Sequence, residues 1–255
     1  KEEEENDDTD LEKQSGSFGF QSVSKKLYRW NIHNNSDRIL NLDWWMDDAY
    51  PETFQFIYKH KATTNTQNIL KSSGSGAQTL WDLRLIPSTN GDSSSFQFRL
   101  NDSQRGGNAI AGRAVSMSLA YDQMTDGQLW NVMLQRMTSS ISGAGIQEYR
   151  LHAATQEGPK ITDYNYVTMS VSGGLVGGST AGGKGFFANQ NWTISGSRHP
   201  LSSSNLFVGE TMSGSISEIR AWNSALSISR FRQHVFNKFS TTGNSIASHE
   251  KELIY

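Results

Sequence analysis

The sequence predicts an antiparallel β-sandwich with one short helix near its C-terminal end, and three observations lead to that prediction. Short stretches rich in Val, Ile, Phe, Tyr and Trp recur along the chain, and many alternate apolar and polar residues as half-buried strands do. Gly, Ser and Asn, which are common turn residues, separate these stretches. Only the segment after Ser227 has clear helical spacing. Many short strands with a single helix favour two sheets packed face to face.

Composition limits the classes of protein that fit. A chain of 255 residues with 35% apolar content can bury a full core as one domain. Its formal net charge of −2 predicts no nucleic-acid partner, and the absence of cysteine excludes disulfides and thiolate catalysis. No apolar run approaches the roughly 20 residues of a membrane helix, so we expect no membrane insertion. Because the chain begins with Lys1, we expect a piece of a longer polypeptide.

Residues 1–17 form a strongly acidic segment with Leu11 as its one sizeable apolar side chain. Such a segment is a solvated linker, because it cannot bury enough apolar surface to offset its ordering entropy. The alternative is an arm that docks on a basic surface of this chain or of a neighbour, which would suit a component of a large assembly. The folded domain is predicted to begin at residue 18.

The first strands are expected around Lys26–Ile32, Ile39–Met46 and Phe54–Tyr58. Trp44 and Trp45 are adjacent in the second of these, so one of them must point out of an alternating strand. An exposed Trp could stack on a sugar, which makes both residues candidates for ligand binding. The other interpretation is a Trp packed under a loop or against a partner.

The middle of the chain is predicted to contain a hairpin, in which Thr79–Ile86 pairs with Phe96–Leu100 across a turn that contains Asn90–Gly91. Trp81, Leu83 and Leu85 share one face of the first strand and should point inward. Further alternating strands follow at 115–119, 129–134, 147–154 and 167–171.

Two features of this part bear on possible sites. In the strand over 147–154, the inward face of Tyr149, Leu151 and Ala153 predicts that His152 points outward. The glycine-rich residues 172–185 lack the spacing of a phosphate-binding loop, and we interpret them as a loop at the rim of the sandwich.

The C-terminal part reads strand, turn, strand and helix. In Ser215–Trp222, Ile219 and Ala221 share a face, whereas Ile216 is out of phase with them and indicates a bulge near Ser217. Ser227 is predicted to cap a short helix that places Ile228, Phe231 and Val235 on one stripe. The tail over 240–255 is expected to pack back on the sandwich or on a neighbouring chain.

This C-terminal order resembles the closing motif of laminin-G-like and pentraxin-like domains of the concanavalin A-like lectin superfamily. The matching positions are Gly214, Ile216, Glu218, Ile219–Ala221, Trp222, Asn223 and Ala225–Ser227. A second match, with one additional residue, comprises Asp126, Gly127, Trp130, Asn131 and Val132, and we expect Trp130 in the core. The resemblance implies a jelly-roll domain over residues 18–239.

Many members of that superfamily bind calcium at the rim of the sandwich through loop aspartates and backbone carbonyls. The resemblance therefore implies possible calcium ligands at Asp102, Asp122 and Asp126, with Asn108 and Asp163 as further ligand-binding candidates. The alternative is that each is an ordinary turn residue, since Asp and Asn are common in turns.

The sequence lacks the motifs of several enzymes. Retaining glycosidases of this fold carry Glu-x-Asp-x-x-Glu, which holds two carboxyl groups about 5 Å apart, and no such run occurs here. The six histidines are scattered without metal-ligand spacing and are expected at the surface, and no Gly-x-Ser-x-Gly elbow is present. We therefore expect a protein that is not an enzyme.

The sequence predicts a non-catalytic binding or structural module, used for adhesion or as part of a larger assembly such as a virion surface. It would bind glycan or protein through its rim loops, with other protein chains as partners and an extracellular or virion location. The alternatives are a soluble, calcium-dependent lectin and a glycoside hydrolase with non-standard catalytic residues.

Overall fold

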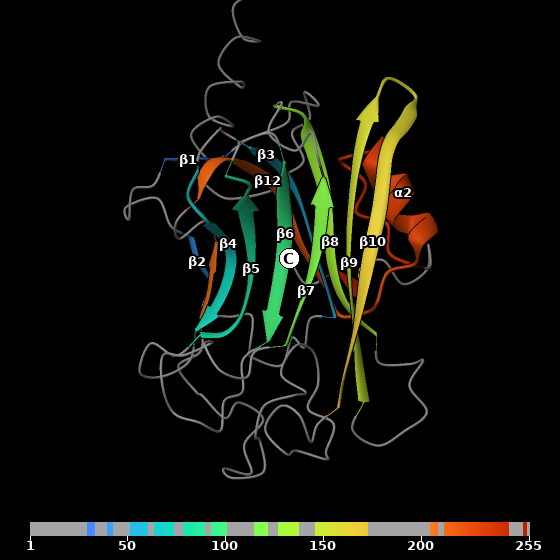
Figure 1. Cartoon of the computed structure of the whole chain (residues 1–255). Coiled ribbons are helices and arrows are strands. Elements are labelled where there is room, and N and C mark those ends of the chain that lie inside the picture. Colours follow the sequence, from blue (N-terminus) through green and yellow to red (C-terminus); the bar gives the residue numbers. More distant parts are fainter. Residues whose placement is uncertain are drawn as a thin grey trace, which may run out of the picture.

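The computed structural model describes residues 30–33, 40–42, 52–60, 64–73, 79–89, 93–100, 115–121, 127–137, 146–172, 205–208, 212–244 and 252–253. These residues form two six-stranded sheets that pack face to face, with helix α2 (Ile228–Phe236) against the outer face of one of them (Figure 1). The strand pairs within both sheets are antiparallel. The predicted all-β jelly-roll sandwich with a short C-terminal helix is confirmed.

The first sheet has the order β1-β12-β3-β8-β9-β10. Its strands are β1 (Trp30–His33), β12 (Ser213–Trp222), β3 (Thr53–His60), β8 (Leu129–Met137), β9 (Ile146–Glu157) and β10 (Lys160–Ser172). The second sheet has the order β2-β11-β4-β5-β6-β7. Its strands are β2 (Leu40–Leu42), β11 (Asn205–Val208), β4 (Gln67–Ser73), β5 (Thr79–Pro87), β6 (Ser94–Leu100) and β7 (Val115–Tyr121).

The main core lies between the two sheets and is rich in aromatic side chains. The predicted hairpin is present as β5 and β6, in which Leu83 pairs with Phe98 and Pro87 with Ser94. Trp130 of β8 is 1% exposed, as expected for a core residue. Phe98 of the second sheet contacts Tyr149 of the first, with 5.3 Å between ring centroids, so aromatic contacts join the two sheets.

Strand β12 contains the predicted bulge. Its pairing with β3 advances from Ser217 opposite Ile57 to Arg220 opposite Gln55, so β12 holds one extra residue there. Glu218 lies within the bulge and has a left-handed backbone conformation, with a φ of 51°. Because of the bulge, Ile216 and Ile219 both face the core although their spacing is odd.

Helix α2 begins as predicted, because the Ser227 hydroxyl accepts a hydrogen bond from the backbone N–H of Arg230. The buried stripe of the helix differs from the predicted one in one residue. Phe231 and Val235 are buried, whereas Ile228 is 37% exposed and His234 takes the remaining buried position. The described part of the C-terminal tail packs back on the sandwich, since Leu253 forms a β-bridge with Trp222.

The expectation of surface histidines is wrong for the three whose side chains are described, because His60, His152 and His234 are all buried. The acidic residues 1–17 and the glycine-rich residues 173–185 lie outside the described residues. In the part of the chain that the structure describes, no helix is both long and apolar enough to cross a membrane.

Candidate functional site

The candidate site lies on the outer face of the first sheet, where α2 covers β8, β9 and β12 and leaves part of β10 uncovered (Figure 1). A second apolar cluster fastens the helix there, separate from the core between the sheets. Its buried members are Met133, Ala154, Trp222, Leu226, Phe231 and Val235. The face therefore has a part sealed by the helix and an exposed part beside it.

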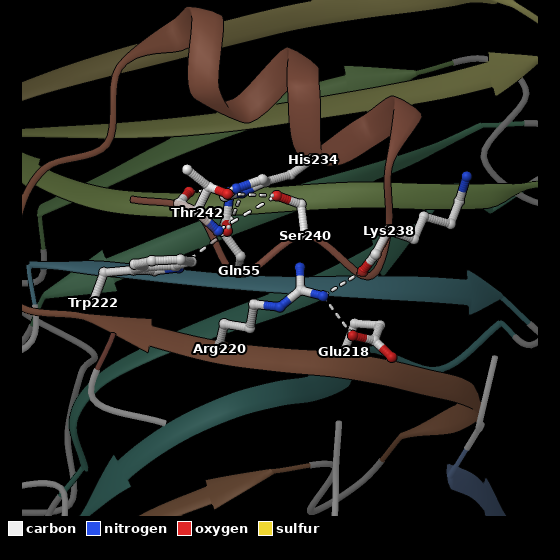
Figure 2. A network of polar contacts seen from close by, with 8 residues as sticks. All are labelled: Gln55, Glu218, Arg220, Trp222, His234, Lys238, Ser240 and Thr242. Carbon is white, nitrogen blue, oxygen red and sulfur yellow. Dashed lines mark hydrogen bonds and ion pairs between the residues drawn. The ribbon is translucent and has the colours of Figure 1, made fainter. Parts of the chain in front are cut away.

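A polar network ties the helix to the sheet beneath it (Figure 2). Gln55 Oε1 accepts a hydrogen bond of 3.0 Å from Trp222 Nε1 and lies 3.0 Å from His234 Nδ1. His234 Nε2 is 2.8 Å from the backbone carbonyl of Thr242. One buried amide of β3 thus joins β12 to the helix, and His234 joins the helix to the segment after it.

A buried ion pair at the bulge forms the other half of this network. Arg220 Nη2 lies 2.5 Å from Glu218 Oε2 and also donates to the backbone carbonyl of Lys238 (Figure 2). Burial raises the pKa of Glu218 and lowers that of Arg220, and the attraction between the two opposes both shifts. Beside the pair is a cavity of about 10 Å³, lined in part by Asn131 and His234, with room for about one water. These groups serve to hold the helix in place.

The exposed part of the face carries three stacked rings, which we call the aromatic step: His152 of β9 with Tyr164 and Tyr166 of β10. The rings of His152 and Tyr166 lie 5.4 Å apart at 18°, and those of Tyr164 and Tyr166 lie 6.3 Å apart at 28°. Tyr166 is 49% exposed, whereas His152 beneath it has no exposed surface. Phe231 of the helix contacts both His152 and Tyr164, so the helix borders the step.

Hydrogen bonds fix the protonation of His152. Gln135 Nε2 donates to the carbonyl of Leu226 at 2.9 Å, which directs Gln135 Oε1 toward His152 Nε2 at 3.1 Å. The proton must therefore sit on Nε2, which leaves Nδ1 to accept from the Tyr164 hydroxyl at 3.1 Å. Burial lowers the pKa of His152 to about 4, with the charge of Arg150 as a lesser cause. The imidazole is consequently neutral near pH 7 and accepts a hydrogen bond from the Tyr164 hydroxyl, whose own pKa is raised by burial.

Two arginines stand beside the step. The guanidinium carbon of Arg232, an exposed residue of α2, lies 5.2 Å from the centroid of the Tyr164 ring. Arg150 of β9 pairs with Glu148, 2.5 Å away. No carboxylate among the described residues pairs with Arg232, so its guanidinium can donate hydrogen bonds to a ligand that lies on the step.

Of the residues predicted to form a site, only Asp163 is described. It lies on β10, half-buried, and its Oδ2 accepts a hydrogen bond of 3.1 Å from Thr155. The other candidates lie outside the described residues: Trp44, Trp45, Asn108, Asp102, Asp122 and Asp126. Within the described ranges, no group of three His, Asp or Glu side chains could hold a metal ion.

The aromatic step is not among the sites predicted from the sequence. The available signal was Tyr164-Asn165-Tyr166, two aromatic residues on one face of a strand whose other face carries Val167 and Met169. An aromatic pair opposite the inward face indicates an exposed or partner-covered surface.

No family model matches the chain, and a comparison with curated proteins gives no match. Solved structures do resemble it. A pentraxin from Limulus polyphemus is 11% identical, with 89% of this chain and 82% of that chain covered and a TM-score of 0.38. The laminin alpha2 LG1-3 region is 11% identical, with 78% and 30% covered and a TM-score of 0.37. An alginate lyase from Klebsiella pneumoniae is 8% identical, with 69% and 60% covered and a TM-score of 0.35.

This chain thus spans less than two thirds of the lyase and of the laminin region. The two antiparallel sheets and the short C-terminal helix agree with the fold that the resemblance to laminin-G-like and pentraxin-like domains implied.

The alginate lyases among these structures overturn the expectation that the protein is not an enzyme. That expectation rested on the absence of glycosidase, metal and serine-nucleophile motifs. Cleavage of a polysaccharide by a lyase is a different reaction, which those motifs do not report. Their absence therefore says nothing about it.

Proposed function

We propose that the protein binds a polysaccharide on the aromatic step. The observation that carries the proposal is Tyr166, which is 49% exposed and lies stacked on the buried ring of His152. A supported, half-exposed ring offers a flat surface to the apolar C–H face of a sugar, at little cost in side-chain entropy. The Tyr164 hydroxyl and the Arg232 guanidinium stand beside that ring and supply directional hydrogen bonds.

The test is a screen of immobilised glycans, followed by calorimetric titration with the ligands that it identifies. Replacing Tyr166 with Ala should weaken binding about tenfold, because stacking contacts of this kind are worth about 1 kcal/mol. Phe236→Ala is the matched control, since Phe236 is 48% exposed on the helix and belongs to no stacked set described here. Equal affinity of the two variants would rule out the step as the binding surface.

Cleavage of the bound polysaccharide is a second candidate function, favoured by the hydrogen bond between Tyr164 and the neutral, buried His152. Burial raises the pKa of the Tyr164 hydroxyl, so it stays protonated near pH 7, and the hydrogen bond to His152 fixes its position, as a general acid that donates a proton to a leaving group requires. The screened glycans should then become shorter on prolonged incubation, and Tyr164→Phe should abolish shortening while binding persists. If the glycans keep their length during incubation with the wild-type protein, cleavage is ruled out and binding is the only one of the two functions that stands.

Calcium, assembly and location remain predictions. If Asp102, Asp122 and Asp126 hold calcium, chelation should abolish binding, which would identify a calcium-dependent lectin. If residues 1–17 dock on neighbouring chains, a structure of the intact extracellular or virion assembly should place them there. Binding that survives chelation would support the aromatic step without a metal.

A further inference from the structure

Strand β10 is the last strand of the first sheet, and among the described residues nothing pairs with its outer edge. It is 13 residues long, whereas β1 at the opposite edge of the same sheet has four. Soluble proteins protect long edge strands with Lys, Pro, bulges or a covering segment, because an open edge recruits other strands. From Tyr164 to Ser172, β10 contains no charged residue, no Pro and no Gly, and its one irregularity lies earlier, between Ile161 and Asp163.

The direction of the backbone along this edge follows from one hydrogen bond. The N–H of Tyr166 donates to the side chain of Asn165 at 2.9 Å, so it points away from β9. In an antiparallel ladder, alternate residues point the same way. Tyr164, Thr168 and Ser170 therefore also direct their backbone groups outward, in position to pair with another strand.

Both faces of the strand carry apolar surface that the monomer leaves partly open. Tyr166 on the outer face is 49% exposed. On the inner face, Val167 and Met169 pack against the main core but are only half-buried. A strand added to β10 would cover side chains on both faces, and burial of apolar surface would add to the backbone hydrogen bonds.

We propose that a second copy of this chain pairs with β10, antiparallel and related by a two-fold axis at Val167, so that the two first sheets join into one. In this register Tyr166 faces Thr168 of the second copy and Tyr164 faces its Ser170, all with outward backbone groups. The Tyr166 N–H would exchange the exposed Asn165 side chain, its acceptor in the monomer, for the Thr168 carbonyl of the second copy. Asp163 faces the uncharged Val171 of the second copy, which keeps the two aspartates far apart. The strand is thus complementary to itself, as an interface about a two-fold axis requires.

The pairing would set the two aromatic steps on the same outer face, on either side of the axis. This goes beyond the proposed saccharide binding and does not depend on it. The dimer could form with no glycan bound.

Sedimentation of the wild-type protein over a range of concentrations tests the proposal. We expect a dimer of twice 28.4 kDa that dissociates on dilution. Thr168→Pro removes one outward N–H without removing a bond to β9, and should leave the monomer at concentrations at which wild type is dimeric. Thr168→Val keeps the N–H and should still dimerise. A wild-type protein that stays monomeric, or a Thr168→Pro dimer as tight as wild type, would overturn the proposal.

A second measurement, which keeps every backbone N–H of β10, tests the pairing even if the Thr168→Pro variant fails to fold. The chain has no cysteine, so Ser170→Cys offers a single position for a spin label. In the proposed register the two labelled backbones lie six residues apart along the pair, roughly 20 Å. A dipolar distance near that value supports the pairing, and a dimer with a clearly different distance contradicts it.

Discussion

Gln55 of β3 and His234 of α2 are 179 positions apart in the sequence and lie 3.0 Å apart in the fold, between Oε1 and Nδ1. The same oxygen accepts the N–H of Trp222, and because an indole nitrogen can only donate, this bond fixes the orientation of the Gln55 amide. Two elements that close the C-terminal end of the chain therefore depend on one acceptor from an early strand. Packing alone would leave these buried polar groups unsatisfied.

Gln55→Leu should destabilise the protein by about 2–3 kcal/mol, because it leaves buried donors of Trp222 and His234 without their acceptor. Urea unfolding at pH 7 measures the loss. Gln233→Leu is the control, since the Gln233 side chain is exposed on α2 and its Oε1 accepts from the exposed Arg230, so a change within about 0.5 kcal/mol is expected. Similar losses in both variants would mean that the buried acceptor has no special role.

At position 218 of β12, glycine should give a more stable protein than alanine, which is the reverse of their usual order in a strand. Its φ of 51° lies in the left-handed region, which glycine adopts without steric cost. Both Glu218→Gly and Glu218→Ala lose the carboxylate that pairs with Arg220, so their comparison isolates the backbone. We expect the Gly variant to be about 1 kcal/mol more stable than the Ala variant in urea unfolding. An Ala variant at least as stable as Gly would show that the bulge relaxes.

The Ser227 cap gives a prediction for the helix alone. Ser227→Ala removes the acceptor for the Arg230 N–H and should lower the free energy of unfolding by about 1 kcal/mol. Ser229→Ala, two residues further along, removes a hydroxyl that lies 3.0 Å from the Ser227 hydroxyl but accepts no backbone N–H of the helix, and should lower stability less than Ser227→Ala does. Thermal unfolding of both variants measures the effect. A Ser229→Ala variant less stable than Ser227→Ala would contradict the assignment of Ser227 as the cap.

Local patterns predicted those parts of the fold that depend on neighbouring residues. The phase break between Ile216 and Ile219 located the bulge, and Ser227 located the start of the helix, because bulges and caps are decided within a few residues. The hairpin of β5 and β6 followed from alternation and turn residues in the same way.

The candidate site depends on contacts that alternation cannot supply. Alternation placed His152 on the outer face of β9, which is correct, but not under a helix that begins 76 positions later, at Ile228. The resemblance implied calcium at Asp102, Asp122 and Asp126, which lie outside the described residues, whereas the described polar groups of the site lie on the face beneath α2. Which side chains share a covered face is a property of the tertiary fold.

The two buried histidines of that face should respond differently to acid. Burial lowers the pKa of both His152 and His234 to about 4. Both ring nitrogens of His234, however, face carbonyl oxygens, of Gln55 and Thr242, so a second proton there gains a hydrogen bond. The charges of Arg220 and Arg230 oppose that gain. His152 offers Nδ1 to a tyrosine hydroxyl instead, and we expect it to tolerate the proton less well than His234.

The folded state should therefore lose stability between pH 6.5 and 4, in part through His152. Its pKa is about 4 when folded and about 6.5 when unfolded, so below pH 6.5 the unfolded chain binds the proton more readily. This contribution is fully present above pH 6.5, and its loss by pH 4 is worth about 3 kcal/mol.

His152→Gln should remove most of that pH dependence, because glutamine keeps polar groups at this position but does not titrate. The measurement is the difference in unfolding free energy between pH 7 and pH 4.5, by urea titration, for wild type and variant. Carboxylates titrate in both proteins, so only the difference between them reports the histidine. We expect wild type to lose about 2 kcal/mol more than the variant, and His234→Gln to flatten the profile less. Equal losses in wild type and His152→Gln would mean that His152 is protonated in the folded protein at little cost in stability. The rings of the aromatic step would then have to separate readily.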